Sequence, residues 1–163
     1  METLRKSDSK RVTPAKKSTP RNVKAPPTAR LVMTADPETI LEEASLFDAA
    51  AKMAELGVRH LPVVDDLGVL VGMLSDRDIR SSIGDPVDAL RGRHEESESR
   101  VSDVMAPDPL RVGLDAPISE IAEMLVDERI GAVPIVDEGD RPVGIVSYVD
   151  LIRFLAAKGS RRV

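Results

Sequence analysis

The sequence predicts a mixed fold of helices and strands, between the α+β and α/β classes, built from two copies of one strand, helix, strand, strand, helix unit. The first observation is a motif, because GMLSDRD at residues 72–78 returns as GIVSYVD at residues 144–150, an offset of 72 residues. The second is that the same offset aligns residues 32–79 with residues 104–151 without a gap. A register kept over that length indicates a tandem duplication of one supersecondary unit.

The composition limits the core and the chemistry of this 163-residue chain. A chain of this length buries one core, or two small subdomains that share one. Apolar residues make up 42% and aromatic residues only 2%, so the core must be built from aliphatic side chains. Base-stacking platforms for single-stranded nucleic acid are therefore not expected. The absence of cysteine excludes disulfides and Cys-based zinc sites, in agreement with a reducing, cytoplasmic location.

Residues 1–29 form a basic arm that we expect to be disordered, because it has too few large apolar residues to offset its ordering entropy. Residues 1–30 contain nine Lys or Arg against two acidic residues, a net charge of +7, which leaves −12 on the rest of a chain whose total is −5. The arm is a solubilising tail, a weak contact for nucleic acid or another polyanion, or an organellar transit peptide. No apolar run resembles a secretory signal or a membrane span, so we expect no membrane insertion.

The first unit is predicted to span residues 30–84. Apolar residues at helical spacing over residues 46–56, followed by a glycine, predict an amphipathic helix with a glycine stop. Apolar runs at residues 60–64 and 69–74 flank turn residues and predict a hairpin that is buried on both faces. A second helix then begins at Ser75.

The second unit is predicted to span residues 101–157 and repeats this order. One helical face is expected from the apolar residues Ile118, Ile121, Ala122, Leu125 and Val126. This helix is expected over residues 118–128. A hairpin is expected from strands at residues 132–136 and 142–146, and the last helix from Ser147 to about residue 157. Residues 85–100 are polar and form a solvated linker, and residues 158–163 are a C-terminal tail.

Ser75 and Ser147 lie where a strand is expected to end and a helix to begin, and Asp78 or Asp150 follows three residues later. A hydroxyl and free helix N–H groups can meet a phosphate there, at the positive end of the helix dipole. A carboxylate has two acceptor oxygens and can take both hydroxyls of a ribose. The Ser-x-x-Asp spacing is also close to a capping box, which needs no ligand, so both interpretations stay open.

At these motifs the chain resembles a tandem pair of CBS domains, the cystathionine-β-synthase-type repeats whose pair is called a Bateman module. The resemblance rests on the openings VMT and VMAPDP, the strands HLPVVD and AVPIVD, and the ends GMLSDRD and GIVSYVD. It covers about residues 30–157. It implies two β-α-β-β-α units packed about a pseudo-twofold axis, with two clefts between them.

The resemblance also implies what the clefts bind. Members of this family commonly bind adenosine-containing ligands such as AMP, ADP, ATP or S-adenosylmethionine, and commonly dimerise into a flat disc. The resemblance assigns phosphate and ribose contacts to the matching Ser and Asp residues, and it places the base near Thr34, His60, Pro62, Ala132 and Pro134. We therefore expect a homodimer with an adenine nucleotide or S-adenosylmethionine as regulatory ligand and no required cofactor. The family also offers precedents for a client enzyme or transporter as partner.

The two copies differ beside the serine. Arg77 can meet a phosphate, or it can pair with Asp76 or Asp78 at the surface, whereas the matching Val149 can do neither. If only one cleft holds a phosphorylated ligand, we expect it to be the cleft with Ser75 and Asp78.

Three further side chains have two interpretations each. Arg153 could replace the missing cation of the second copy, or be solvated. Tyr148 could stack against a base, although we expect it to pack within the protein. His60 is expected to be a satisfied, partly buried side chain rather than a pH-sensitive contact.

Catalysis finds little support in the sequence. It shows no Ser-His-Asp arrangement, no paired carboxylates at a legible spacing and no Walker or dinucleotide glycine motif, and the glycines are assigned to turns. Two isolated histidines without cysteine make no convincing metal site. The leading hypothesis is a non-enzymatic adenine-nucleotide sensor that controls a partner or its own assembly. The alternative is a ligand-free dimerisation scaffold whose basic arm contacts nucleic acid or another polyanion.

Overall fold

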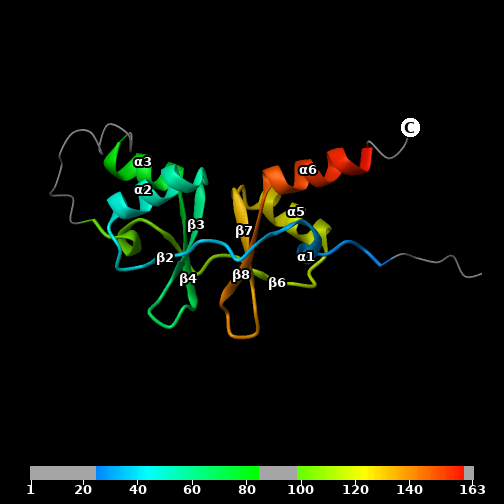
Figure 1. Cartoon of the computed structure of the whole chain (residues 1–163), viewed down its shortest axis with the longest axis horizontal. Helices are drawn as coiled ribbons and strands as arrows, with labels where there is room; N and C mark the ends of the chain where they lie inside the picture. Colours follow the sequence, from blue (N-terminus) through cyan, green and yellow to red (C-terminus); the bar gives the residue numbers. More distant parts are fainter. Residues whose placement is uncertain (1–24, 85–98, 160–163) are drawn as a thin grey trace, which may run out of the picture.

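The computed structural model describes residues 25–84 and 99–159, which form two similar units side by side (Figure 1). Each unit has a four-stranded sheet with parallel and antiparallel pairs, and two main helices. The mixed fold class and the two β-α-β-β-α units predicted from the sequence are confirmed. The predictions for the arm, for most of the linker and for the last residues of the tail lie outside the described residues.

The first sheet has the strand order β2-β3-β4-β5, in which β2 and β3 are parallel and the other pairs are antiparallel. The strands are β2 (Ile40–Leu41), β3 (His60–Val64), β4 (Leu70–Ser75) and β5 (Ala106–Pro107). The helices of this unit are α2 (Leu46–Leu56) and α3 (Asp76–Ile83). The apolar runs predicted as a hairpin are β3 and β4, and most of their side chains are buried.

The second sheet repeats this arrangement in the order β6-β7-β8-β1. Its strands are β6 (Val112–Gly113), β7 (Ala132–Val136), β8 (Pro142–Ser147) and β1 (Thr34–Ala35). Its helices are α5 (Ile118–Asp127) and α6 (Tyr148–Gly159). The core of both units is aliphatic, and none of the described residues is a buried polar or charged one.

The two units exchange their first strands, which the sequence did not lead us to expect. Thr34 of β1 pairs with Ile145 of β8, and Ala106 of β5 pairs with Met73 of β4, at positions that the offset of 72 residues relates. Each pair joins one unit's opening segment to the other unit's sheet. The chain of Figure 1 accordingly passes through α1 beside α5 and then crosses to the first unit.

The short helices at the start of each unit are exchanged in the same way. They are α1 (Ala29–Val32) and the 3₁₀ helix η1 (Val101–Asp103). Ala29 is completely buried in the core of the second unit, and Val101 is completely buried in the core of the first. The predicted boundaries at residues 30–84 and 101–157 therefore describe units of sequence, whereas each folded unit contains a segment from the other.

Gly113 ends β6, and Gly72 and Gly144 lie inside β4 and β8, so the prediction that the glycines serve turns was wrong for these three. A Cβ on Gly72 would lie 2.3 Å from Sδ of Met105, and a Cβ on Gly144 would lie 2.4 Å from Sδ of Met33. Both methionines belong to the exchanged opening segments. Gly72 and Gly144 are therefore needed so that a side chain from the other unit can lie against the strand.

Local signals place both ends of α2, but two residues predicted on apolar helix faces, Leu56 and Val126, are exposed. The hydroxyl of Ser45 accepts a hydrogen bond from the Asp48 N–H at 3.0 Å, and Gly57 ends α2 in the left-handed conformation at φ 65°. Val126 was predicted to lie on the buried face of α5, but 68% of it is exposed. Five residues separate it from the buried Ile121, which at 3.6 residues per turn is a rotation of about 140° to the other side of the helix.

Candidate functional site

The first Ser-x-x-Asp motif lies at the junction of β4 and α3. The backbone N–H of Ser75 donates to Oδ2 of Asp78 at 2.8 Å, and its hydroxyl donates to the same oxygen at 2.5 Å. The N–H of Asp78 donates to the hydroxyl of Ser75 at 3.2 Å, which completes a capping box. Ser75 therefore begins α3 without any ligand.

The second motif, at the junction of β8 and α6, repeats two of these three hydrogen bonds. The N–H and the hydroxyl of Ser147 donate to Oδ2 of Asp150 at 2.8 and 2.6 Å. The structure thus supports the capping interpretation in the first copy, where the box is complete, whereas in the second copy the serine donates to the aspartate without the reciprocal bond. In both copies the serine donates to Oδ2 of the aspartate and not to Oδ1. For a ribose to take both oxygens, the serine hydroxyl must turn away, and a phosphate nearby would give it a new acceptor.

The first turn of α3 has only part of its N–H groups free for an anion. The N–H of Asp76 donates to the carbonyl of Arg59 at 2.9 Å, and the N–H of Asp78 is held by Ser75. The N–H of Arg77, between them, has no acceptor among the described residues. An anion at this helix terminus would therefore meet one free backbone donor and the movable hydroxyl of Ser75.

Arg77 is exposed and makes no ion pair within the described residues, whereas Asp76 pairs with Arg80 at 3.1 Å. The alternative in which Arg77 pairs with Asp76 or Asp78 is therefore not observed among the described residues. In the second copy Arg153 lies 4.0 Å from Asp150, with 77% of its side chain exposed. The cation of the first copy is unpaired, while that of the second already faces its aspartate.

His60 lies between the two units. It begins β3 opposite Ser75, and its Nε2 would lie 2.2 Å from a Cβ on Gly131 of the second unit. Burial lowers the pKa of His60 below its ordinary value, an effect that the nearby Asp78 and Asp76 oppose and that Arg59 and Arg77 reinforce. The imidazole is therefore neutral at pH 7, in contact with the other unit and within electrostatic reach of Asp78.

The structure separates the residues that were expected near the base. Pro62 is completely buried and Pro134 and Ala132 are buried, so their side chains offer little surface to a ligand. Thr34 is exposed, but it pairs with Ile145 in the second sheet, two residues before Ser147. The exchange of first strands thus places Thr34 with the second motif, and the place equivalent to it beside the first motif is taken by Ala106.

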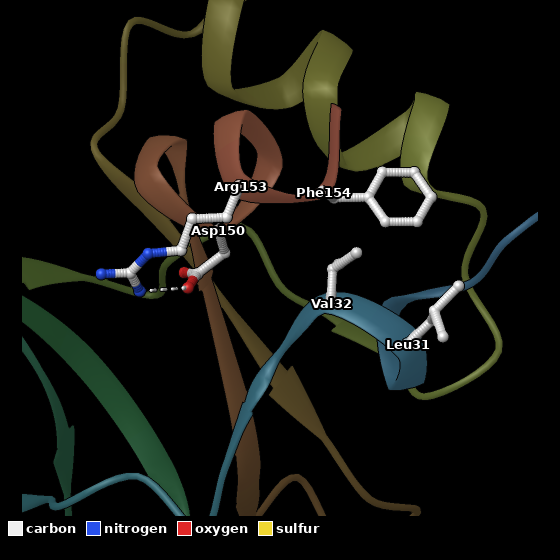
Figure 2. Close-up of a pocket in the computed structure, with 5 residues that line it drawn as sticks. All are labelled: Leu31, Val32, Asp150, Arg153 and Phe154. Carbon is white, nitrogen blue, oxygen red and sulfur yellow. Dashed lines mark ion pairs between the residues drawn. The ribbon is translucent and has the colours of Figure 1, made fainter. Parts of the chain in front are cut away.

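A small pocket of about 240 Å³ lies beside the second motif (Figure 2). Asp150, Arg153 and Phe154 of α6 line it together with Leu31 and Val32 of α1. In Figure 2 the guanidinium of Arg153 points away from the apolar side chains and toward the aspartate. Leu31 and Val32 were not expected beside the second motif, because α1 reaches α6 only through the exchange of opening segments, and no local pattern assigned Phe154 to a pocket.

Tyr148 follows the packing interpretation in this structure. Its hydroxyl donates to the carbonyl of Leu125 at 3.0 Å, which ties the start of α6 to α5. The tyrosine is therefore already engaged by its own unit.

These observations describe two strand-to-helix junctions at positions related by the offset of 72 residues. A family model for the CBS domain matches residues 29–85 and 101–157. The chain belongs to the CBS-domain family. The two matched segments are the two units whose opening strands are exchanged.

Solved CBS pairs share this architecture. The CBS domain pair of protein MJ0100, solved in complex with 5′-methylthioadenosine and S-adenosyl-L-methionine, superposes with a TM-score of 0.68 at 26% identity, covering 82% of this chain and 98% of that one. CBSX2 in complex with AMP, a protein from Arabidopsis thaliana, superposes with a TM-score of 0.68 at 28% identity, covering 83% and 98%.

Curated relatives include CBS pairs within larger proteins. A homoserine O-acetyltransferase of Methanococcoides burtonii is 36% identical over 124 residues, which are 76% of this chain but only 23% of that protein. An inosine-5′-monophosphate dehydrogenase of Methanocaldococcus jannaschii is 28% identical over 122 residues, 22% of its length. This CBS pair therefore spans less than a quarter of either enzyme.

The described part of the CBS pair contains neither a metal-binding cluster nor a membrane-spanning helix. Within residues 25–84 and 99–159, no group of three His, Cys, Asp or Glu side chains could hold a metal ion. None of the described helices is both long and apolar enough to cross a membrane.

Proposed function

We propose that this CBS pair is a non-enzymatic, cytoplasmic regulatory module that binds an adenosine-containing ligand, such as AMP, ADP, ATP or S-adenosylmethionine, at its Ser-x-x-Asp junctions. The observation that carries the proposal is the paired geometry of Ser75 with Asp78 and Ser147 with Asp150. Each pair presents a rotatable hydroxyl, a carboxylate oxygen and a helix N-terminus at one place. Adenosine ligands are bound by the solved CBS pairs of MJ0100 and CBSX2, which supports this ligand class.

The first junction is the better site for a phosphorylated ligand. Arg77 is exposed and unpaired among the described residues, so it can meet a phosphate without breaking an ion pair. Arg153 would first have to leave Asp150. The pocket between α1 and α6 has apolar walls from Leu31, Val32 and Phe154, which favours a less charged ligand at the second junction.

The outer face of α6 supports assembly into a homodimer. Val149, Ile152 and Leu155 are 52%, 64% and 65% exposed, and none of the α6 side chains is buried. The matching positions of α3 are Arg77, Arg80 and Ile83. An exposed apolar face on only one of two duplicated helices marks an interface, and a second copy can present the same face across a twofold axis.

Regulation also requires a recipient of the signal. The enzymes in which relatives of this CBS pair occur support a client enzyme, or a transporter, that this chain contacts when the ligand changes its packing. A ligand shifts such an equilibrium only by its different affinity for the two packings.

The proposal is tested by calorimetry with AMP, ADP, ATP, NADH and S-adenosylmethionine on the wild type, Asp78→Ala, Asp150→Ala and Asp76→Ala. We expect at least one ligand to bind more tightly than about 1 mM, and binding to weaken by about tenfold or more in Asp78→Ala or Asp150→Ala. Asp76→Ala is the matched control, because this acid lies in the same turn but faces Arg80. Wild-type protein that binds none of the ligands, or aspartate variants that bind like the control, would refute the proposal.

A second candidate function is supported by the complete capping box of Ser75, which needs no ligand. The chain would then be a dimerisation scaffold whose basic arm contacts nucleic acid or another polyanion. Salt-dependent binding of DNA or RNA that is lost on deleting residues 1–24 would support it. The deletion should end there, because Ala29 belongs to the core of the second unit.

A further inference from the structure

A shallow groove of about 700 Å³ lies along β6, at the outer edge of the second sheet. Its apolar floor consists of Val112, Leu114, Ala116 and Val136. Its rim carries the carboxylates of Asp115, Glu120, Asp137 and Glu138, and the guanidinium groups of Arg30 and Arg111. None of the residues that line the groove belongs to the Ser-x-x-Asp junctions.

The positive charges of this groove are already compensated. Arg111 pairs with Asp108 at 2.8 Å and with Asp140 at 3.0 Å, two acids that do not line the groove. Arg30 pairs with Asp115 at 3.5 Å. Glu120 and Glu138 make no ion pair with any described residue, so the rim keeps a negative potential.

Asp137 adds to this potential because it stays ionised. Backbone N–H groups of Arg141 and Gly139 donate to its Oδ1 at 3.0 and 2.8 Å and lower the pKa of Asp137 below its ordinary value. Asp137 therefore carries its negative charge at neutral pH.

The first unit shows what such an edge receives. There, the segment that enters from the linker bridges Ser45 through Arg100, and Arg100 also forms an ion pair with Glu43. In the second unit the entering segment is the end of the arm, where Thr28 bridges Pro117, and Asp115 stands at the position of Glu43. In the second unit the cation on this acid is Arg30, which enters on the same segment and pairs with Asp115 at 3.5 Å.

The strand along this groove contains a residue without a side chain. Gly113 of β6 stands where the first unit has Leu41, which is 52% exposed, and a Cβ on Gly113 would meet nothing within 4 Å. A strand edge without a side chain leaves room for an extended segment to approach the backbone.

The basic arm enters the structure at this groove. The carbonyl of Pro27 accepts a hydrogen bond from the Ile118 N–H at 3.0 Å, and the N–H of Ala29 donates to the carbonyl of Ala116, in the groove floor, at 2.8 Å. Residues 1–24 carry eight Lys or Arg against Glu2 and Asp8. We infer that residues 1–24 bind along this groove of their own chain, with Lys and Arg side chains at Glu120 and Glu138.

Reach and strength are compatible with this placement. An extended segment of 24 residues spans up to about 80 Å, so the arm can return over the groove from Pro27. Each exposed ion pair is weak and screened by salt over about 8 Å at physiological ionic strength. The arm is therefore held by several weak contacts and is released by salt or by a competing polyanion. Binding to the groove and binding to a polyanion would then exclude each other.

Zero-length carbodiimide cross-linking of the full chain, followed by peptide mass spectrometry, tests the inference. We expect lysines of the arm, such as Lys17 and Lys24, to couple to Glu120 and Glu138 at about threefold or higher yield than to Glu55 and Asp66, which are exposed acids of the first unit, with the preference lost in high salt. Cross-links spread evenly over the four acids would overturn the inference.

A matched pair of variants gives a second measurement. Glu120→Gln with Glu138→Gln should raise the rate of tryptic cleavage within the arm by about threefold or more, whereas Glu55→Gln with Asp66→Asn, which removes the same charge, should leave it unchanged. Equal rates in the two variants would count against the groove. In a cross-linked mixture of ordinary and ¹⁵N-labelled chains, the two peptides of each cross-link must carry the same isotope. Cross-links that join the two isotopes at random would show that the arm binds another copy.

Discussion

The thioether of Met33 lies against Gly144, so close that its Sδ is 2.4 Å from the point where a Cβ would stand on that glycine. Met105 and Gly72 form the equivalent contact in the other unit at 2.3 Å. Each methionine comes from the exchanged opening segment of one unit and each glycine from the sheet of the other. The valine-methionine opening and the glycine of the Gly-x-x-Ser motif are thus two halves of one contact.

Gly144→Ala should lower the free energy of unfolding by about 1–3 kcal/mol, because the added methyl displaces Met33 from its place on β8. Combining it with Met33→Ala should cost less than the sum of the two changes, with a coupling of about 0.5 kcal/mol or more in urea unfolding. Gly113→Ala is the control, since its Cβ would meet nothing within 4 Å. Strictly additive effects would contradict the contact.

Ser75→Ala should destabilise the ligand-free protein by about 1 kcal/mol, because the hydroxyl accepts the Asp78 N–H at the start of α3. Chemical denaturation measures this. Ser81→Ala, within the same helix, should change the stability by less than about 0.5 kcal/mol, because the Ser81 hydroxyl only donates to the carbonyl of Arg77 one turn before it. Similar losses in both variants would mean that the cap contributes nothing specific.

His60 should make the stability of the protein depend on pH. Burial lowers its pKa in the folded protein, so the unfolded chain binds the proton more readily, and stability is full above pH 6.5 and is lost as the pH falls below it. Asp78 and Asp76 limit the effect, and Arg59 and Arg77 add to it. Thermal unfolding of the wild type and His60→Gln between pH 7.5 and pH 5 should show a steeper loss in the wild type; parallel curves would contradict the prediction.

Ile152→Glu should weaken self-association by about tenfold or more, because it places a carboxylate in the middle of the apolar face of α6. Sedimentation equilibrium gives the dissociation constants. Arg80→Gln, at the matching position of α3, should leave the association unchanged. A wild type that is monomeric at every concentration tested would exclude the homodimer itself.

Arg129→Gly should stabilise the protein by about 0.5–1 kcal/mol, because Arg129 has φ 54° after α5, a conformation that favours glycine. The matching residue of the first unit is Gly57 at φ 65°, and Gly57→Arg should be destabilising by a similar amount. Differential scanning calorimetry of both variants checks the pair of signs. A lower melting temperature for Arg129→Gly would show that the arginine side chain has a structural role.

The parts of this fold that could be predicted carry their signals locally. The bounds of α2 agree with the prediction because Ser45 and Gly57 mark its ends, and β3 and β7 agree because their apolar runs are continuous. The exchange of β1 and β5 could not be predicted, since two-residue strands with exposed side chains show no periodicity. This is also why Thr34 was not assigned to the second sheet, and why Leu31 was missed at the pocket beside Asp150.

The candidate site was predictable as residues but not as a network. The sequence alone indicates Ser75 and Asp78, yet only the structure shows that their shared hydrogen bond must open before a ribose can use both carboxylate oxygens. The contact of His60 with Gly131 joins positions in different units, and no local pattern reports it.

The reciprocal strand exchange also makes each unit depend on the other. A single unit of this kind lacks one edge of its own sheet and carries, in its place, a strand that fits another copy. A polypeptide with one such unit would be complete only as a strand-swapped dimer, and the present chain holds the two halves of that arrangement in one covalent molecule. Within one chain the two halves can differ: α3 carries Arg77 and Arg80 at the positions where α6 carries the exposed apolar Val149 and Ile152.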